Sequence, residues 1–301
     1  MRMAALVLLA ALIGGCGEVA DARPGTLRVV ATTGMVADLA RVIGGKEVDV
    51  IALMGPGVDP HAYKASALDL DRLRSARLIL YNGLGLEGRM GDLFVKLARK
   101  QAVVAVTESV DPERLLEPPE LRGHFDPHLW FDVGLWAETT TVVAEALAEV
   151  APEHAALFRS RAHAYRQELL ALHEEVKREL ATIPARRRVL LTSHDAFRYF
   201  GRAYDLEVSG LQGISTVDDP GVKDIREMAE LIAERSIKAL FVESSVSPKA
   251  IQAVHEWVRR KGHDIRIGGT LFSDAMGDTP PTDTYIGMVR ANTRTIVEAL
   301  R

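Results

Sequence analysis

The stretch PEHAALFRSRAHAYRQELLALHEEVKRELATIP, residues 152–184, predicts one long helix. Its apolar side chains recur at steps of four, three, four, four and three residues, which places them on one helical face. They are Tyr165, Leu169, Leu172, Val176, Leu180 and Ile183. Pro152 suits a first helical turn, and Pro184 ends the run. About thirty residues at 1.5 Å each would form a rod of roughly 45 Å.

On either side of this helix, the chain alternates short apolar strands with helices. Before it we expect strands at 27–32, 48–53, 78–81 and 102–106, and helices at 35–43, 65–75 and 89–99. After it we expect strands at 189–192, 206–209, 239–243 and 264–267, and helices at 196–203, 222–235, 248–261 and 285–300. This alternation is typical of an α/β fold with parallel sheets covered by helices on both faces.

The α/β pattern therefore occurs twice, which predicts two lobes. We expect an N-terminal α/β lobe at 27–151, a connecting helix at 152–184 and a C-terminal α/β lobe at 185–301. A long surface helix of a single domain is the alternative, but a position between two α/β sets favours a connector. Such a stiff connector would limit how far the lobes open.

The first residues predict export. Residues 1–15 have a positive start at Arg2 and an apolar run over residues 3–13, as a secretory signal peptide does. That run is well short of the roughly 20 apolar residues that span a membrane. Leu12-Ile13-Gly14-Gly15-Cys16 resembles a bacterial lipobox, so we expect a lipid on Cys16 and a lipid-anchored linker over residues 16–26. An ordinary signal peptide that happens to contain a cysteine is the alternative.

The composition is that of a globular protein, with 48% hydrophobic and 26% charged residues. A formal net charge of −4 argues against a polyanionic partner, and the sequence has no glycine-rich phosphate loop. We therefore expect no nucleic-acid partner. Cys16 is the only cysteine, so no disulfide within the chain can form.

Three histidines and one aspartate lie in short polar segments that are far apart in the sequence: His61, His128, His194 and Asp274. Imidazole nitrogens with one carboxylate suit a borderline divalent metal ion. All four lie in expected loops, and three follow expected strands, where open parallel sheets bind ligands. Singly, a histidine beside a proline is more often a turn residue, and Asp274 could cap a helix. Together they predict a metal site between the lobes.

The other six histidines fit a solvated surface better than a ligand set. They are His124, His154, His163, His173, His255 and His263. Three acids beside the expected ligands, Asp59, Asp195 and Glu243, are candidates for holding the imidazole N–H groups in place. Each could equally be an ordinary loop or strand-end acid.

Several motifs resemble the TroA-like family of metal-binding lipoproteins, which serve bacterial ABC importers. The matching segments run in order along nearly the whole chain after the signal peptide. They are GVDPH at 57–61, YNGLGLE at 81–87, DPHLW at 126–130, TSHDAF at 192–197, GIST at 213–216, VESS at 242–245 and GGTLFSDAMG at 268–277.

The resemblance implies two α/β lobes joined by one long helix, with His61, His128, His194 and Asp274 as ligands of a metal held between the lobes. Some members have Glu at the third position, where this chain has His194. The histidine-rich loop of many zinc-selective members is absent, which leaves zinc and manganese open, with iron also possible. The implied protein is a monomeric solute-binding lipoprotein that serves an ABC permease and its ATPase. It would be exported and anchored at the outer face of the cell membrane or in the periplasm.

Two other classes remain as alternatives. A zinc-dependent hydrolase could use the same ligands, but His-Glu-x-x-His is absent and four protein ligands leave less room for a reactive water. An adhesion or interaction lipoprotein would need neither a cleft nor a metal.

Overall fold

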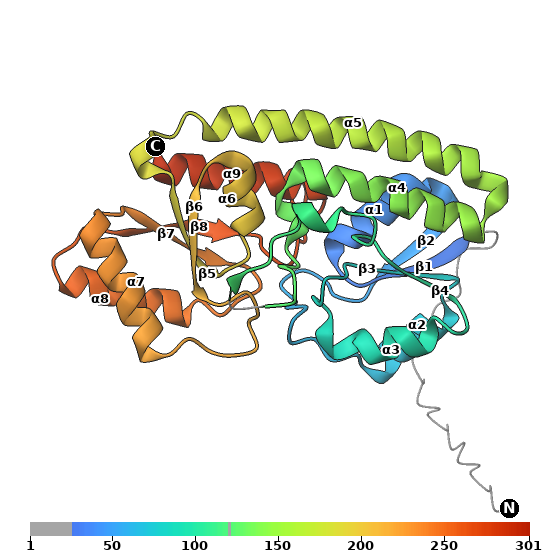
Figure 1. Cartoon of the computed structure of the whole chain (residues 1–301), viewed down its shortest axis with the longest axis horizontal. Coiled ribbons are helices and arrows are strands. Elements are labelled where there is room, and N and C mark those ends of the chain that lie inside the picture. Colours follow the sequence, from blue (N-terminus) through green and yellow to red (C-terminus); the bar gives the residue numbers. More distant parts are fainter. Residues whose placement is uncertain (1–25, 120–121) are drawn as a thin grey trace, which may run out of the picture.

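The computed structural model describes residues 26–119 and 122–301 and contains two α/β lobes (Figure 1). Cys16 and the expected signal peptide lie outside the described residues. Within the described ranges, no helix is both long and apolar enough to cross a membrane.

The N-terminal lobe contains one parallel sheet in the order β2-β1-β3-β4. Its strands are β1 (Leu27–Ala31), β2 (Val48–Ala52), β3 (Leu78–Tyr81) and β4 (Ala102–Ala105). Its helices are α1 (Gly34–Gly44), α2 (Ala67–Ser75), α3 (Gly91–Leu97) and α4 (Val133–Val150). Short 3₁₀ turns lie between them: η1 (Gly45–Glu47), η2 (Gly88–Met90), η3 (Pro112–Arg114) and η5 (Leu129–Phe131).

Alternate residues of β1 enter different cores, as a strand with a period of two requires. Val29 and Ala31 belong to the core that includes α1 and α4, whereas Val30 belongs to the core that includes α2 and α3. Both faces of the sheet are thus covered, which explains why its strands are almost uniformly apolar.

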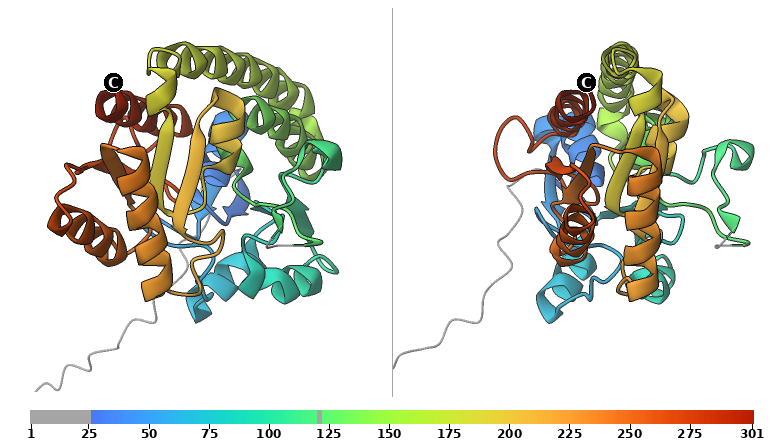
Figure 2. Two further views of the ribbon diagram at one scale, coloured as in Figure 1. Left: turned by 60° about the vertical axis from the view of Figure 1, so that its left-hand side comes forward. Right: turned by 90° about the vertical axis from the view of Figure 1, so that its left-hand side faces the viewer.

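The C-terminal lobe contains two parallel strand pairs, β5 (Val189–His194) with β6 (Glu207–Gln212) and β7 (Ala239–Glu243) with β8 (Arg266–Leu271). Strand β5 also lies beside β7. The lobe's helices are α6 (Arg198–Tyr204), α7 (Val222–Arg235), α8 (Lys249–Arg260) and α9 (Tyr285–Leu300). The left view of Figure 2 shows β5 and β6 side by side, with α5 above them.

The long helix α5 (Ala155–Leu180) runs along both lobes, above α4 in one and α9 in the other (Figures 1 and 2). It has 26 residues, and a 3₁₀ turn, η6 (Pro152–His154), precedes it. The predicted stripe is buried, with Leu169 and Leu180 fully covered. The two-lobed fold with a long helix is therefore confirmed, although the helix is shorter at each end than predicted.

Most predicted elements lie within a few residues of the observed ones, and the exceptions are local. The helix expected at 89–99 is divided between η2, which ends at Met90, and α3, which begins at Gly91. Strands β6 and β8 continue to Gln212 and Leu271, beyond the expected ends at 209 and 267. A further 3₁₀ turn, η7 (Ala185–Arg187), separates α5 from β5.

Candidate metal centre

The structure brings all four predicted side chains together. His61 lies in the loop after β2, and His128 immediately precedes η5, so both come from the N-terminal lobe. His194 is the last residue of β5, and Asp274 follows β8, so both come from the C-terminal lobe. One potential ligand atom from each residue can be chosen so that all lie within 4.8 Å of one another.

The imidazole nitrogens converge on one point. His128 Nε2 lies 3.2 Å from His61 Nε2 and 3.4 Å from His194 Nε2. Asp274 Oδ2 lies 3.2 Å from His194 Nε2 and 3.7 Å from His61 Nε2. Asp274 Oδ1 lies 3.5 Å from His128 Nε2. Ligand atoms at these separations can surround a single small ion.

Asp274 is the most informative member of this cluster. The residue is 2% exposed, and neither carboxylate oxygen makes a hydrogen bond within the described part of the chain. A buried charge without hydrogen bonds is costly unless a cation compensates it. His128 and His194 are fully buried and His61 is 7% exposed, so water contributes little solvation here.

Two further carboxylates orient the rings of His128 and His194. Asp126 Oδ1 lies 2.7 Å from His128 Nδ1, and Glu243 Oε2 lies 2.5 Å from His194 Nδ1. Because a carboxylate accepts hydrogen bonds, each ring carries a proton on Nδ1 and turns its Nε2 toward the cluster, where that nitrogen offers a lone pair to an ion once it is deprotonated. Glu243 Oε1 also accepts a bond from the backbone N–H of His194 at 2.8 Å.

Asp59 and Asp195 have other contacts. Asp59 Oδ1 accepts a bond from the backbone N–H of His61 at 2.8 Å, rather than from its ring. Asp195 Oδ2 accepts a bond from Arg198 Nε at 2.6 Å. Of the three acids singled out in the sequence, only Glu243 therefore bonds to an imidazole ring in the described structure.

Asp126 is a supporting residue that was not predicted from the sequence. The signal was a repeated Asp-Pro-His, at Asp59 to His61 and at Asp126 to His128. In both copies, the aspartate accepts a bond from the histidine N–H two residues on, at 2.8 and 2.9 Å. The intervening proline has no N–H, which favours this tight turn.

Trp130 was also missed. Its ring centroid lies 5.2 Å from that of His128, and its Nε1 donates to the carbonyl oxygen of Ser273 at 3.1 Å. This bond joins the two lobes beside Asp274. Nothing local in the sequence indicates that this tryptophan contacts the other lobe.

The charges of the cluster are strongly coupled. Burial lowers the pKa of His61 to about 4, and the neighbouring imidazoles act in the same direction while Asp274 opposes them. Burial alone would lower the pKa of His194, but Asp274 and Glu243 outweigh it and raise that pKa well above its usual value. Burial would raise the pKa of Asp274, but His194 outweighs this effect and lowers it.

The remaining histidines lie away from the cluster. His124, His163 and His263 are exposed, as expected. His154, His173 and His255 are half-buried instead of solvated. The His154 ring centroid lies 5.9 Å from that of Phe158, His173 Nδ1 lies 3.1 Å from the hydroxyl of Tyr204, and His255 Nε2 lies 3.1 Å from the carbonyl oxygen of Ile265.

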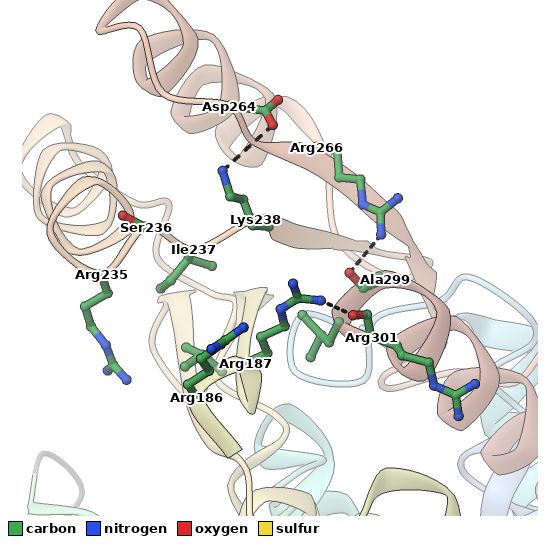
Figure 3. A pocket seen from close by; sticks show the side chains of 12 residues that line it. Arg186, Arg187, Arg235, Ser236, Ile237, Lys238, Asp264, Arg266, Ala299 and Arg301 are labelled. Carbon is green, nitrogen blue, oxygen red and sulfur yellow. Dashed lines mark hydrogen bonds and ion pairs between the residues drawn. The ribbon is translucent and has the colours of Figure 1, made fainter. Parts of the chain in front are cut away.

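A pocket of about 590 Å³ lies at the other end of β5, β7 and β8, away from the cluster (Figure 3). Basic side chains, including Arg235, Lys238 and Arg266, line it. The C-termini of α7 and α9 lie there, and helix C-termini attract cations. Arg266 donates to the carbonyl oxygens of Glu298 and Ala299, so this part of the basic lining has a structural explanation.

Known proteins share the sequence pattern and the fold of this chain. Residues 29–299 match the family ZnuA, described as "Zinc-uptake complex component A periplasmic". The chain belongs to the ZnuA family. Among solved structures, the periplasmic zinc-binding protein TroA from Treponema pallidum matches this ZnuA-family chain with a TM-score of 0.89 and 47% identity. The match covers 92% of this chain and 99% of that one.

Two relatives of this ZnuA-family chain are named for different metals. The manganese-binding lipoprotein MntA of Bacillus subtilis (strain 168) is 45% identical over 302 residues, which cover 99% of this chain and 98% of the relative. The zinc-binding protein TroA of Treponema pallidum (strain Nichols) is 46% identical over 288 residues, which cover 95% and 92%. Overall similarity therefore does not favour one metal.

The pKa of His61 gives a test of the cluster in the metal-free protein. An ordinary imidazole titrates near pH 6.5, whereas burial should keep the His61 ring neutral until the pH falls to about 4. Ring ¹⁵N shifts followed by NMR during a pH titration measure this, and a His61→Gln variant assigns the signal. A His61 midpoint near pH 6.5 would contradict the buried, coupled arrangement.

Proposed function

We propose that this protein is an extracytoplasmic solute-binding lipoprotein, which captures a divalent transition metal ion between its lobes and delivers it to an ABC importer. The observation that carries this proposal is the buried Asp274 carboxylate, which faces three imidazole nitrogens and has no hydrogen bond to residues 26–119 or 122–301. In this proposal His61, His128, His194 and Asp274 are the metal ligands, and the ion is the cargo.

The donor set suits zinc or manganese. Three imidazole nitrogens and one carboxylate oxygen match the four-coordinate geometry of zinc. Among the residues that the structure describes, none forms a hydrogen bond with either oxygen of Asp274, so both oxygens are available to the ion. Bidentate coordination would give manganese a higher coordination number. The Irving–Williams order gives zinc a higher intrinsic affinity than manganese, whether Asp274 binds through one oxygen or two. The metal imported in the cell then depends on metal availability as well as affinity.

In this proposal, Asp126 and Glu243 hold two of the histidine rings in the orientation that the ion requires. Their contacts with His128 Nδ1 and His194 Nδ1 fix the rings, so the nitrogens need little reorganisation when the ion binds. Asp59 supports His61 through its backbone instead. Asp195, which pairs with Arg198, has no direct role in this proposal.

A carrier accounts for the cluster better than a hydrolase does. All four ligand residues are at least nine-tenths buried, and the named relatives are metal-binding proteins. A hydrolytic zinc needs an open position for water and a general base close to it. Here the two carboxylates nearest the cluster, Asp126 and Glu243, are engaged with imidazole rings. An adhesion role would leave the buried ligand set without a purpose.

The partners and location follow from the family. We infer a monomer that is exported, that is lipid-anchored through Cys16 at the outer face of the cell membrane or in the periplasm, and that meets a cognate permease with its ATPase. The relative MntA carries the name lipoprotein, which supports the anchor.

Metal loading tests the proposed function. Protein purified from its native compartment should contain about one zinc or manganese ion per chain by elemental analysis. Adding the metal at about 100 times its Kd should stabilise the fold by roughly 2.7 kcal/mol, seen as a higher Tm. A His61→Ala, Asp274→Ala double variant should lose both effects, whereas His263→Ala, which changes an exposed histidine, should keep them.

Assays for hydrolysis on the same metal-loaded protein separate the alternatives. Metal-dependent stabilisation without hydrolysis is the result that we expect. Hydrolysis that the double variant abolishes would favour the hydrolase instead. Full stabilisation of the double variant by metal would contradict the ligand assignment. Competition between zinc and manganese then ranks the two cargoes.

Membrane partition tests the anchor. Expressed with its signal peptide in a bacterium, the full chain should enter the detergent phase in a phase-separation assay, because acyl chains confer membrane affinity. A Cys16→Ala variant should remain in the aqueous phase or keep an uncleaved signal. Equal partition of a correctly processed Cys16→Ala variant would contradict lipidation at this residue.

A further inference from the structure

Another hydrogen bond joins the two lobes near the ligand cluster, besides that of Trp130 with Ser273. Thr216, in the loop after β6, donates through its hydroxyl to Asp59 Oδ2 at 2.5 Å. Asp59 belongs to the N-terminal lobe and Thr216 to the C-terminal lobe, and they are 157 positions apart in the sequence. The ligand arrangement described above does not use this contact.

The same carboxylate also supports a ligand residue. Asp59 Oδ1 accepts a bond from the backbone N–H of His61 at 2.8 Å. His61 is the most exposed of the four, at 7%, and its bond to Asp59 is through the backbone rather than the ring. Its position therefore depends on a carboxylate that the opposite lobe also holds.

The loop that carries Thr216 begins beside another ligand residue. Gln212, the last residue of β6, pairs in register with His194, and the backbone N–H of Asp195 donates to the carbonyl oxygen of Gly213 at 3.3 Å. Gln212 Nε2 also donates to the carbonyl oxygen of Asp218 at 3.0 Å, which steadies the loop. The Thr216–Asp59 bond therefore links the His61 loop to the strand beside His194.

This bond differs from the bond between Trp130 and Ser273, which also joins the lobes near the site. The bond from Trp130 Nε1 to the carbonyl oxygen of Ser273 is buried, so breaking it would disturb the core. Thr216 and Asp59 are only partly buried, and Ser215 and Val217 beside Thr216 are exposed. The Thr216–Asp59 bond can therefore break while the packed interior remains intact.

We propose that Thr216 and Asp59 form a clasp at the rim of the metal centre, and that this clasp sets how fast the ion leaves. With the clasp closed, His61 stays in place over the cluster. When the hydroxyl separates from the carboxylate, the His61 loop is free to move, and His61 is the first ligand to leave. Thr216 is thus a positioning residue, and its role rests on the metal-binding function proposed above.

Substitution of Thr216 tests the clasp. Thr216→Val keeps the shape of the side chain but removes the donor, whereas Thr216→Ser keeps the hydroxyl. Zinc-loaded protein is mixed with excess chelator in a stopped-flow instrument, and zinc release is followed. We expect release from Thr216→Val to be about tenfold faster, the size expected for losing one partly exposed bond to a charged acceptor. Thr216→Ser should release zinc at nearly the unmodified rate.

A matched control changes the neighbouring hydroxyl. Ser215 accepts a bond from Val217 N within the same loop, so Ser215→Ala should leave the release rate unchanged. The zinc stoichiometry of Thr216→Val should also match that of the unmodified protein, because this variant keeps all four ligand residues. These readouts distinguish the clasp from general damage to the fold.

The outcomes separate the clasp from the function on which it rests. If the unmodified protein binds no metal at this site, both proposals fail. If all variants bind one ion and Thr216→Val releases it at the unmodified rate, the clasp alone is overturned. Equally fast release from Thr216→Val and Ser215→Ala would also overturn it, because the effect would then belong to the loop and not to the bond with Asp59.

Discussion

The central feature of the structure is a buried cluster of nitrogen and oxygen atoms from three histidines and one aspartate. Three imidazole nitrogens and the carboxylate of Asp274 lie within 4.8 Å of one another, and all four residues are buried. Asp126 and Glu243 add two more buried carboxylates directly behind the rings. Such a group is costly to bury unless a cation compensates it. This is the physical reason to regard the cluster as a cation site rather than as an ordinary polar core.

The surrounding fold keeps these atoms in place. One apolar core runs through both lobes and includes Leu80 of β3, Leu169 of α5, Phe241 of β7 and Met288 of α9. Because protein interiors are close-packed, separating the lobes as rigid bodies would disturb this shared core. Small movements of loops at the rim need no such disturbance. The architecture thus favours release through the loops that carry His61 and Thr216.

The sequence predicted the elements and the four-residue cluster because both leave local signals. The helical stripe that includes Leu169 and the apolar strands of both lobes follow simple periodicities, and each potential ligand lies in a polar segment beside a strand or turn. The supporting contacts were harder to predict. Asp126 and Asp195 each lie close to a histidine in the sequence, yet only Asp126 bonds to an imidazole ring. That difference depends on side-chain directions, as does the contact of Trp130 with the other lobe.

Anomalous diffraction from crystals of the metal-loaded protein, recorded at the zinc or manganese edge, tests the central claim most directly. The account predicts one strong peak at bonding distance, about 2.0–2.2 Å for zinc, from the Nε2 atoms of His61, His128 and His194 and from the carboxylate of Asp274. The Nδ1 atoms of the three histidines should face away from the ion. Asp126 and Glu243 should still bond to Nδ1 of His128 and of His194. An ion bound elsewhere, or a peak that excludes Asp274, would contradict the account.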